Sequence, residues 1–362
     1  PDSLNMRYNL ALAQYNAGNK SQAQQEFLEI VNLNPQDAGA LNALAVIYLE
    51  QNDATKALEF ARSAIELDPG NPHVTDTYAK AEIMAIAMNP SVHNPPKTLA
   101  WNPDAIAVVI GNRDYENKDI PSVDFAINDS ATVKKYLVNV LGFKPGNIIY
   151  VENASKAKFE SIFGNRDSHK ARLYSYLKKG KSDIFVFYSG HGAPDIDSRR
   201  GYFVPSDAEA NIIAITGYSL DTFLDNITKI SEEMESPNVT VVIDACFSGA
   251  TEGGLIMKNA SPITIEINNP ILKSENIVLM TAASGSELSS WYPEQEHGLF
   301  TYFFLKALRD RANQGDLNIT AGEIFASIED KTEGLPYLAR RLYQRIQTPQ
   351  IQGNKEIRLI KQ

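Results

Sequence analysis

Two apolar segments of the sequence end in turns of small residues, and each turn carries one reactive side chain. Residues 183–192 (DIFVFYSGHG) end on His191 and a glycine, and residues 239–249 (VTVVIDACFSG) contain Cys246, the single cysteine of the chain. Uninterrupted runs of β-branched and apolar residues of this length indicate buried strands. If the two strands are neighbours in a parallel sheet, side chains at their carboxyl ends face a common crevice. The pattern therefore predicts an imidazole and a thiol at one edge of a sheet.

From residue 105 onward, strand patterns alternate with helical patterns. Further strands are predicted at 105–111, 147–151, 276–283 and, as the last strand, 356–360 (EIRLI). Helices are predicted at 128–143, around 173–177, at 220–230, at 298–308 and from Thr320. Thr320 and Glu323 have the spacing of a capping box. This alternation is typical of a mostly parallel sheet with helices on both faces. In such a fold the functional site lies at the carboxyl ends of the strands.

The first 87 residues repeat with a period of 34 residues, which is the period of tetratricopeptide repeats. Pro35 and Pro69 are 34 residues apart, and the small residues Ala11, Ala45 and Ala79 recur at the same spacing. The resemblance implies an all-α domain of two complete repeats and a third helix, with a concave surface that recruits or senses a partner protein. The turn at Pro1 predicts a still earlier repeat. The alternative is a helical hairpin bundle without a binding role.

A proline-rich stretch separates the two patterns. Residues 88–104 contain four prolines and little periodicity, so they cannot continue the repeat helices. We therefore predict a repeat domain at 1–87, a linker at 88–104 and an α/β domain at 105–362.

The composition excludes several classes of function. One cysteine excludes an internal disulfide framework and a cysteine-rich zinc site, which favours a reducing compartment, the cytoplasm. The formal charge of −10 argues against nucleic acid or an anionic membrane as the partner. No apolar run reaches the roughly 18 to 20 residues that span a bilayer.

A thiol beside an imidazole is an arrangement for nucleophilic catalysis. A free thiol is only slightly ionised at neutral pH, and a neighbouring imidazole that takes its proton activates it for attack on a carbonyl carbon. The oxyanion that forms needs donors, and the backbone N–H groups of Gly192 and Cys246 lie in suitable turns. Taken singly, Cys246 could be a small buried hydrophobe and His191 a hydrogen-bonded core residue.

The two turns resemble the catalytic motifs of caspase-like cysteine peptidases, and most closely those of the bacterial metacaspase-like or orthocaspase branch. The motifs are YSGHG at 188–192 and DACFSG at 244–249, supported by VVIGNRDY at 108–115, FAIND at 125–129, FVPSDA at 203–208, HGLFTYFF at 297–304 and QTPQI at 347–351. The resemblance implies a caspase-like fold, His191 as general base, Cys246 as nucleophile, and the amides of Gly192 and Cys246 as the oxyanion hole.

The residue two positions before the nucleophile predicts the specificity. Caspases proper have Gln there and cleave after aspartate, whereas this chain has Asp244. A carboxylate in the specificity pocket (S1) pairs with Arg or Lys. Asp129 matches the second pocket carboxylate of metacaspase-like enzymes; the alternative for Asp129 is a helix N-cap. Asp124, Glu287 and Glu294 are further candidates without motif support.

Calcium activation is common among metacaspase-like enzymes, although the chemistry itself needs no cofactor. Asp207 matches one position of their acidic cluster, Asp195 and Asp197 are nearby in sequence, and Gly253 stands where the group often has Asp. The sequence therefore leaves a metal site undecided.

Residues 250–275 form a long connection after the cysteine strand. Long connections inside compact domains are usually functional. Lys258 and Lys273 would fit a basic pocket as sites of self-cleavage, and the alternative is an ordinary substrate-binding loop.

The sequence thus predicts a cytoplasmic cysteine endopeptidase that cleaves protein substrates after Arg or Lys, with repeats that bind a partner protein. Two alternatives belong to other classes: a scaffold with a vestigial peptidase domain, and a thiol hydrolase or acyltransferase that is not a peptidase.

Overall fold

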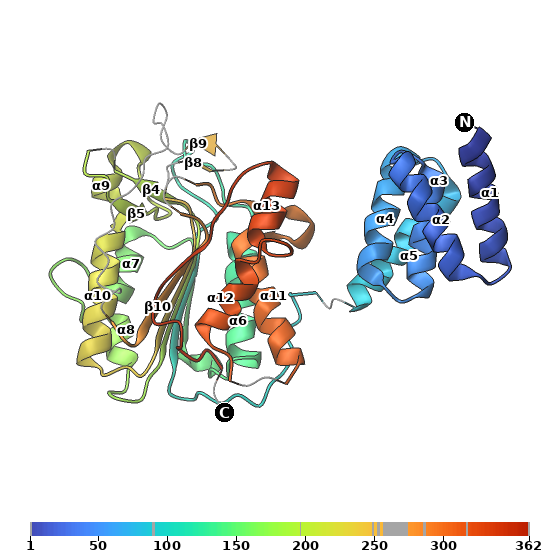
Figure 1. Ribbon diagram of the computed structural model, residues 1–362. Helices are drawn as coiled ribbons and strands as arrows, with labels where there is room; N and C mark the ends of the chain where they lie inside the picture. Colours follow the sequence, from blue (N-terminus) through green and yellow to red (C-terminus); the bar gives the residue numbers. More distant parts are fainter. Residues whose placement is uncertain are drawn as a thin grey trace. The chain divides into compact units, whose positions relative to one another are not determined.

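The computed structural model describes residues 2–88, 91–195, 197–247, 250–251, 254–255, 274–284, 287–315 and 318–360. The chain divides into two compact units, Pro1–Asn94 and Pro95–Gln362 (Figure 1). The division falls inside the proline-rich stretch. On its carboxyl side, the Thr98 N–H donates to the Asn139 carbonyl at 2.9 Å and the Asn102 N–H to the Gly142 carbonyl at 3.0 Å, so residues 98–102 pack on the second unit.

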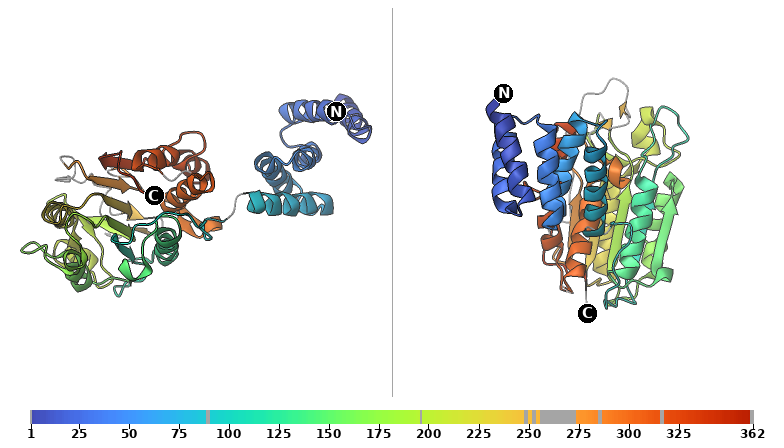
Figure 2. Two further views of the ribbon diagram at one scale, coloured as in Figure 1. Left: turned by 90° about the horizontal axis from the view of Figure 1, so that it is seen from below. Right: turned by 90° about the vertical axis from the view of Figure 1, so that its right-hand side faces the viewer.

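The first unit is a stack of helices, seen side by side in Figure 2. They are α1 (Asp2–Asn16), α2 (Lys20–Leu33), α3 (Ala38–Glu50), α4 (Ala54–Leu67) and α5 (Pro72–Met88). The inter-repeat turns begin helices through side-chain caps: Asp37 accepts a hydrogen bond from the Ala40 N–H at 2.9 Å. Ala11 and Ala45 are fully buried where helices cross, because only small residues allow such close approach. The predicted repeat architecture is confirmed.

The second unit is built on a sheet with the strand order β13-β10-β7-β3-β1-β2. The strands are β1 (Ile106–Gly111), β2 (Ile148–Glu152), β3 (Ile184–Ser189), β7 (Val239–Asp244), β10 (Ile277–Thr281) and β13 (Gln350–Gly353). All neighbours are parallel except β13, which runs antiparallel to β10 at the edge. The central strands are buried on both faces, which explains their uninterrupted apolar sequences.

Helices cover both faces of this sheet (Figure 1). On one side lie α7 (Lys156–Phe163), α8 (Arg172–Tyr176) and α10 (Leu220–Glu233), and on the other α6 (Ala126–Asn139), α11 (Leu299–Asn313), α12 (Ala321–Ile328) and α13 (Leu335–Tyr343). Successive strand residues point to opposite faces. Val186 therefore packs in the core between the sheet and helices α7 and α10. The Phe185 side chain points to the opposite face, where its ring centroid lies 6.4 Å from that of Phe304 in α11. The predicted mostly parallel sheet with helices is confirmed.

Short elements surround the carboxyl ends of the central strands. They are β4 (Gly192–Pro194), β5 (Gly201–Phe203), β6 (Tyr218–Ser219), α9 (Ile213–Thr216), β8 (Ala250–Thr251), β9 (Gly254–Leu255), β11 (Trp291–Tyr292) and β12 (His297–Gly298), with 3-10 turns at Ala210–Ile212 and Pro293–Gln295. A further 3-10 turn, Pro145–Asn147, lies at the opposite edge, directly before β2. The Thr320 capping box is present at the start of α12. None of the helices in the described part of the chain has the length and apolar character needed to cross a membrane.

The prediction of a last strand at 356–360 is wrong. The edge strand is β13, at Gln350–Gly353, and the backbone turns away at Gly353, where φ is 83°. Residues 356–360 lie instead against the start of α12, where the Ala321 N–H donates to the Ile357 carbonyl at 2.8 Å. Ile357 and Ile360 are buried there, so the apolar signal came from packing outside the sheet.

Candidate active site

The two motif turns lie side by side, because β3 and β7 are neighbours in the sheet. Their last residues, Ser189 and Asp244, are directly opposite each other in the register. His191 and Cys246 follow these residues and line one small cavity of about 30 Å³. The structure therefore brings together the imidazole and the thiol that the sequence predicted at one edge of the sheet.

His191 is held by groups from the loop after β1. The His191 ring stacks on the Tyr115 ring, with centroids 5.1 Å apart. The backbone N–H of His191 donates to the Tyr115 hydroxyl at 3.0 Å. The Nε2 atom lies 2.7 Å from the Pro121 carbonyl, which can only accept, so Nε2 carries the proton and Nδ1 is free of one in the neutral ring. Burial lowers the pKa of His191 to about 4. The imidazole is therefore neutral at physiological pH and can accept a proton at Nδ1.

Cys246 is buried, with 6% of its surface exposed. Burial raises the pKa of the thiol to about 12, while the Ser289 N–H, which donates to Sγ, acts in the opposite direction. Gly192 lies against the same turn: a Cβ atom there would come within 2.7 Å of both the Cys246 carbonyl and the Phe247 ring. A glycine is therefore required after His191 for the two turns to approach each other.

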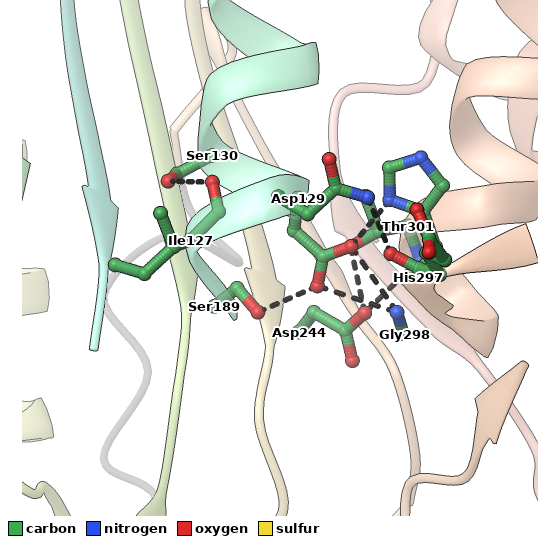
Figure 3. Close-up of polar contacts among 10 residues, drawn as sticks. Ile127, Asp129, Ser130, Ser189, Asp244, His297, Gly298 and Thr301 are labelled. Atoms are coloured by element: carbon green, nitrogen blue, oxygen red, sulfur yellow. Dashed lines mark hydrogen bonds and ion pairs between the residues drawn. The ribbon is translucent and has the colours of Figure 1, made fainter. Parts of the chain in front are cut away.

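Two buried carboxylates, Asp129 and Asp244, line the same cavity as the thiol and the imidazole. Figure 3 shows the two carboxylates beside each other. Asp244 Oδ2 accepts hydrogen bonds from the N–H and the hydroxyl of Thr301, at 3.0 and 2.7 Å. Asp244 Oδ1 accepts a hydrogen bond from the Ser289 hydroxyl at 2.9 Å. Burial, together with the charge of Asp129, raises the pKa of Asp244 to about 6. The negative charge of Asp129 therefore favours the protonated form of Asp244.

Asp129 reaches this site from the first turn of α6. Its Oδ1 lies 2.7 Å from His297 Nδ1, its Oδ2 accepts a hydrogen bond from the Ser189 hydroxyl at 2.8 Å, and the Gly298 N–H donates to Oδ1 at 3.1 Å. The N-cap position of α6 is Phe125, without a side-chain cap. The N-cap alternative for Asp129 is thus not what the structure shows.

The amino end of α11 faces both carboxylates. Gly298 is its N-cap residue and lies between them, since a Cβ atom on Gly298 would collide with Asp244 and come within 3.1 Å of Asp129 Oδ2. The free N–H groups and the positive end of a helix stabilise buried anions. His297, Gly298 and Thr301 all belong to the HGLFTYFF segment, which the sequence marked only as part of a resemblance.

The other carboxylates considered from the sequence do not line the cavity. Asp124 accepts a hydrogen bond from the Ser122 hydroxyl, Glu287 accepts from the N–H and hydroxyl of Thr348, and Glu294 lies in an exposed 3-10 turn. The contacts of Asp124 and Glu287 are therefore structural.

The residues suggested for calcium do not form a site in the described ranges. Asp207 Oδ1 accepts a hydrogen bond from the Lys156 N–H at 2.8 Å, at the start of α7, whereas Asp195 Oδ2 closes a turn with the Ser198 N–H at 2.9 Å. Across the described residues, no three or more His, Cys, Asp or Glu side chains gather so that they could hold a metal ion. Gly253, Lys258 and Lys273 lie outside the described residues.

Comparisons with known proteins place the chain in a family. A family model described as a caspase domain matches residues 104–358, and one described as a tetratricopeptide repeat matches residues 8–72. A comparison with curated protein sequences finds no match.

Solved structures resemble each part of the chain. Caspase-1 from Spodoptera frugiperda aligns with 14% identity over 72% of this chain and 90% of its own, with a TM-score of 0.44. A structure titled pro-sf-caspase-1 aligns with 13% identity over 72% of this chain and 91% of its own, with a TM-score of 0.47. A tetratricopeptide repeat domain protein from Salinibacter ruber aligns with 26% identity over 22% of this chain and 96% of its own, with a TM-score of 0.21.

The caspase-domain model covers more than half of the chain and includes both strands that carry the site. The chain therefore belongs to the caspase domain family of cysteine peptidases and carries tetratricopeptide repeats ahead of that domain.

Proposed function

We propose that this chain is a cysteine endopeptidase that cleaves protein substrates after Arg or Lys, with Cys246 as nucleophile and His191 as base. The observation that supports this most is the cavity that both residues line, because two buried carboxylates, Asp129 and Asp244, lie on its wall. A pocket of this kind beside a thiol selects a cationic side chain next to the bond that is cut.

The proposed reaction follows from the state of the two catalytic groups. Neutral His191 accepts the Cys246 proton at Nδ1 while the sulfur bonds to the substrate carbonyl carbon, and the oxyanion is stabilised by the Gly192 and Cys246 amides. The imidazolium then protonates the leaving amine as the C–N bond breaks. Water, deprotonated by the same imidazole, hydrolyses the thioester and restores the thiol.

Electrostatics support the proposed preference for basic residues. The two carboxylates repel each other, and this repulsion helps to raise the pKa of Asp244. A guanidinium or ammonium group relieves the repulsion and forms charge-assisted hydrogen bonds, whereas an aspartate side chain adds a third negative charge. Arg and Lys substrates are therefore favoured over Asp substrates.

The repeat unit is proposed to bind a partner protein or a segment of the substrate. Between α1 and α3 it has a cavity of about 180 Å³ lined by apolar and aromatic side chains, among them Tyr8, Leu12, Tyr15 and Phe27. Aromatic groups around a concave site are typical of surfaces that bind peptides. A pocket of this kind supports a binding role over a purely structural hairpin bundle.

A cleavage profile on a peptide library tests the proposal, with and without calcium and with Cys246→Ala as control. We expect cuts after Arg and Lys only, and none with the Cys246→Ala variant. If the folded protein cleaves no peptide, yet Cys246 is acylated by simple thioesters, the chain is a thiol hydrolase or acyltransferase. If neither reaction occurs, the peptidase unit is a scaffold.

A further inference from the structure

Ser289 contacts both functional parts of the proposed site at once. Its hydroxyl donates to Asp244 Oδ1 at 2.9 Å, and its backbone N–H donates to Cys246 Sγ. Ser289 lies just before β11, more than 40 positions along the chain from both partners. Ser289 thus donates hydrogen bonds both to a carboxylate of the proposed specificity pocket and to the proposed nucleophile.

Gln347 holds the segment that carries Ser289 in place. This side chain is fully buried, and its Oε1 accepts a hydrogen bond from the Ser290 N–H at 2.9 Å. Its Nε2 donates to the Ala282 carbonyl at 3.0 Å and approaches the Ser289 hydroxyl at 3.5 Å. The position of Ser289 is therefore defined by the tertiary structure from two sides.

The carboxylate oxygen that Ser289 occupies differs from the other three. Asp244 Oδ2 and both oxygens of Asp129 accept hydrogen bonds from Ser189, or from Gly298 and Thr301 around the amino end of α11. These donors belong to the end of β3 and to the N-cap and first turn of α11. Asp244 Oδ1 is bound by Ser289, from a connecting segment that lines the cavity.

The cavity is narrow while Ser289 is in this position. Its volume of about 30 Å³ has room for roughly two water molecules. An arginine or lysine side chain that reaches Asp244 Oδ1 competes for this oxygen with the Ser289 hydroxyl. A guanidinium or ammonium group forms a stronger hydrogen bond to a carboxylate than a serine hydroxyl does. The substrate side chain can therefore replace the Ser289 hydroxyl as the donor to Asp244 Oδ1.

We propose that Ser289 is a specificity-determining residue that couples recognition of a basic side chain to release of the nucleophile. A guanidinium or ammonium group that takes Asp244 Oδ1 displaces the Ser289 hydroxyl, and the movement withdraws the Ser289 N–H from Cys246 Sγ. A neutral or acidic side chain cannot replace the Ser289 hydroxyl at Asp244. The Ser289 N–H then remains hydrogen-bonded to Cys246 Sγ, and the thiol remains buried. This inference rests on the proposed cleavage after Arg or Lys.

The state of the thiol agrees with a covered site. Burial is the largest cause of the raised pKa of Cys246. Displacement of Ser289 removes an N–H donor that favours the thiolate, but it also admits water to the sulfur. Burial has the larger effect on the pKa of Cys246, so the net change favours the thiolate. Selectivity for basic substrates then arises twice, in binding and in the reactivity of Cys246.

The test measures alkylation of Cys246 by iodoacetamide on the full chain, in which this is the single cysteine. The probes are n-butylguanidine, which contains the arginine side chain and Cα but no peptide groups, and its neutral isostere n-butylurea. Binding of each is measured separately by calorimetry. The variants are Ser289→Ala and, as a matched control, Ser290→Ala, whose hydroxyl has no hydrogen-bond partner within the described part of the structure.

We expect n-butylguanidine to raise the alkylation rate of the wild type and of Ser290→Ala by about fivefold or more, the factor that corresponds to one hydrogen bond. We expect n-butylurea to leave the rate unchanged. Ser289→Ala should still bind n-butylguanidine, but its alkylation rate should not respond.

Two results would overturn the inference in distinguishable ways. If n-butylguanidine binds the wild type and the alkylation rate stays constant or falls, the coupling is refuted and the basic pocket stands. If n-butylguanidine does not bind while Cys246 is alkylated normally, the basic pocket itself is refuted, and the coupling fails with it.

Discussion

Asp244 should lower the stability of the fold at neutral pH, and Asp244→Asn tests this directly. The substitution changes little in shape. The amide oxygen can accept both hydrogen bonds from Thr301, and the amide nitrogen can donate to the Ser289 hydroxyl, where the carboxylate now accepts at 2.9 Å. The variant therefore removes one buried negative charge and keeps the contacts.

The size of the effect follows from the pKa of Asp244. Burial and the neighbouring charge of Asp129 raise it from the ordinary value of 3.8 to about 6, so the folded protein binds this proton more tightly than the unfolded chain. Its contribution to stability is present below pH 3.8 and is lost as the pH rises through 6. At about 1.4 kcal/mol for each tenfold change in proton affinity, the loss is about 3 kcal/mol.

The assay is urea denaturation of the wild type and Asp244→Asn between pH 4 and pH 8, followed by tryptophan fluorescence. Both tryptophans, Trp101 and Trp291, belong to the second unit, so the signal reports that unit. We expect Asp244→Asn to gain most of this difference, about 2.5 kcal/mol, relative to the wild type between pH 4 and pH 8, while it loses cleavage after Arg. A free-energy difference between the two proteins that is constant with pH would refute the reasoning.

Further predictions concern the catalytic pair, the pocket and the repeats. Cys246→Ala and His191→Ala should each abolish peptide cleavage with unchanged circular dichroism, because nucleophile and base act as one unit; cleavage by Cys246→Ala would contradict the mechanism. The kcat/KM for an Arg peptide should fall as the pH drops below about 6, because protonation of Asp244 removes the charge that binds the substrate, and a rate independent of pH from 5 to 7 would exclude this role. Residues 95–362 alone should still cleave a small Arg peptide but lose selectivity on the natural protein substrate; loss of small-peptide cleavage by this folded unit would mean that the repeats complete the active site.

Local patterns in the sequence were enough to predict the repeats, the main strands and the positions of His191 and Cys246. Helical and strand periodicity depend on which face of an element is buried, and small residues at a strand end indicate a tight turn, so both signals lie within a few residues. The same reasoning failed at 356–360, because an apolar run does not distinguish a strand from a segment that is buried against the end of a helix.

The chemistry of the site was decided by tertiary structure. Asp244 is bound by Ser289 and Thr301, which lie 45 and 57 positions away, and Asp129 is bound by His297, 168 positions away. Sequence spacing carries no information about such contacts, because they depend on which strand ends and helix ends share one edge of the sheet. The sequence could therefore name two candidate carboxylates, but only the fold placed them beside each other, against the amino end of α11, and so raised the pKa of Asp244.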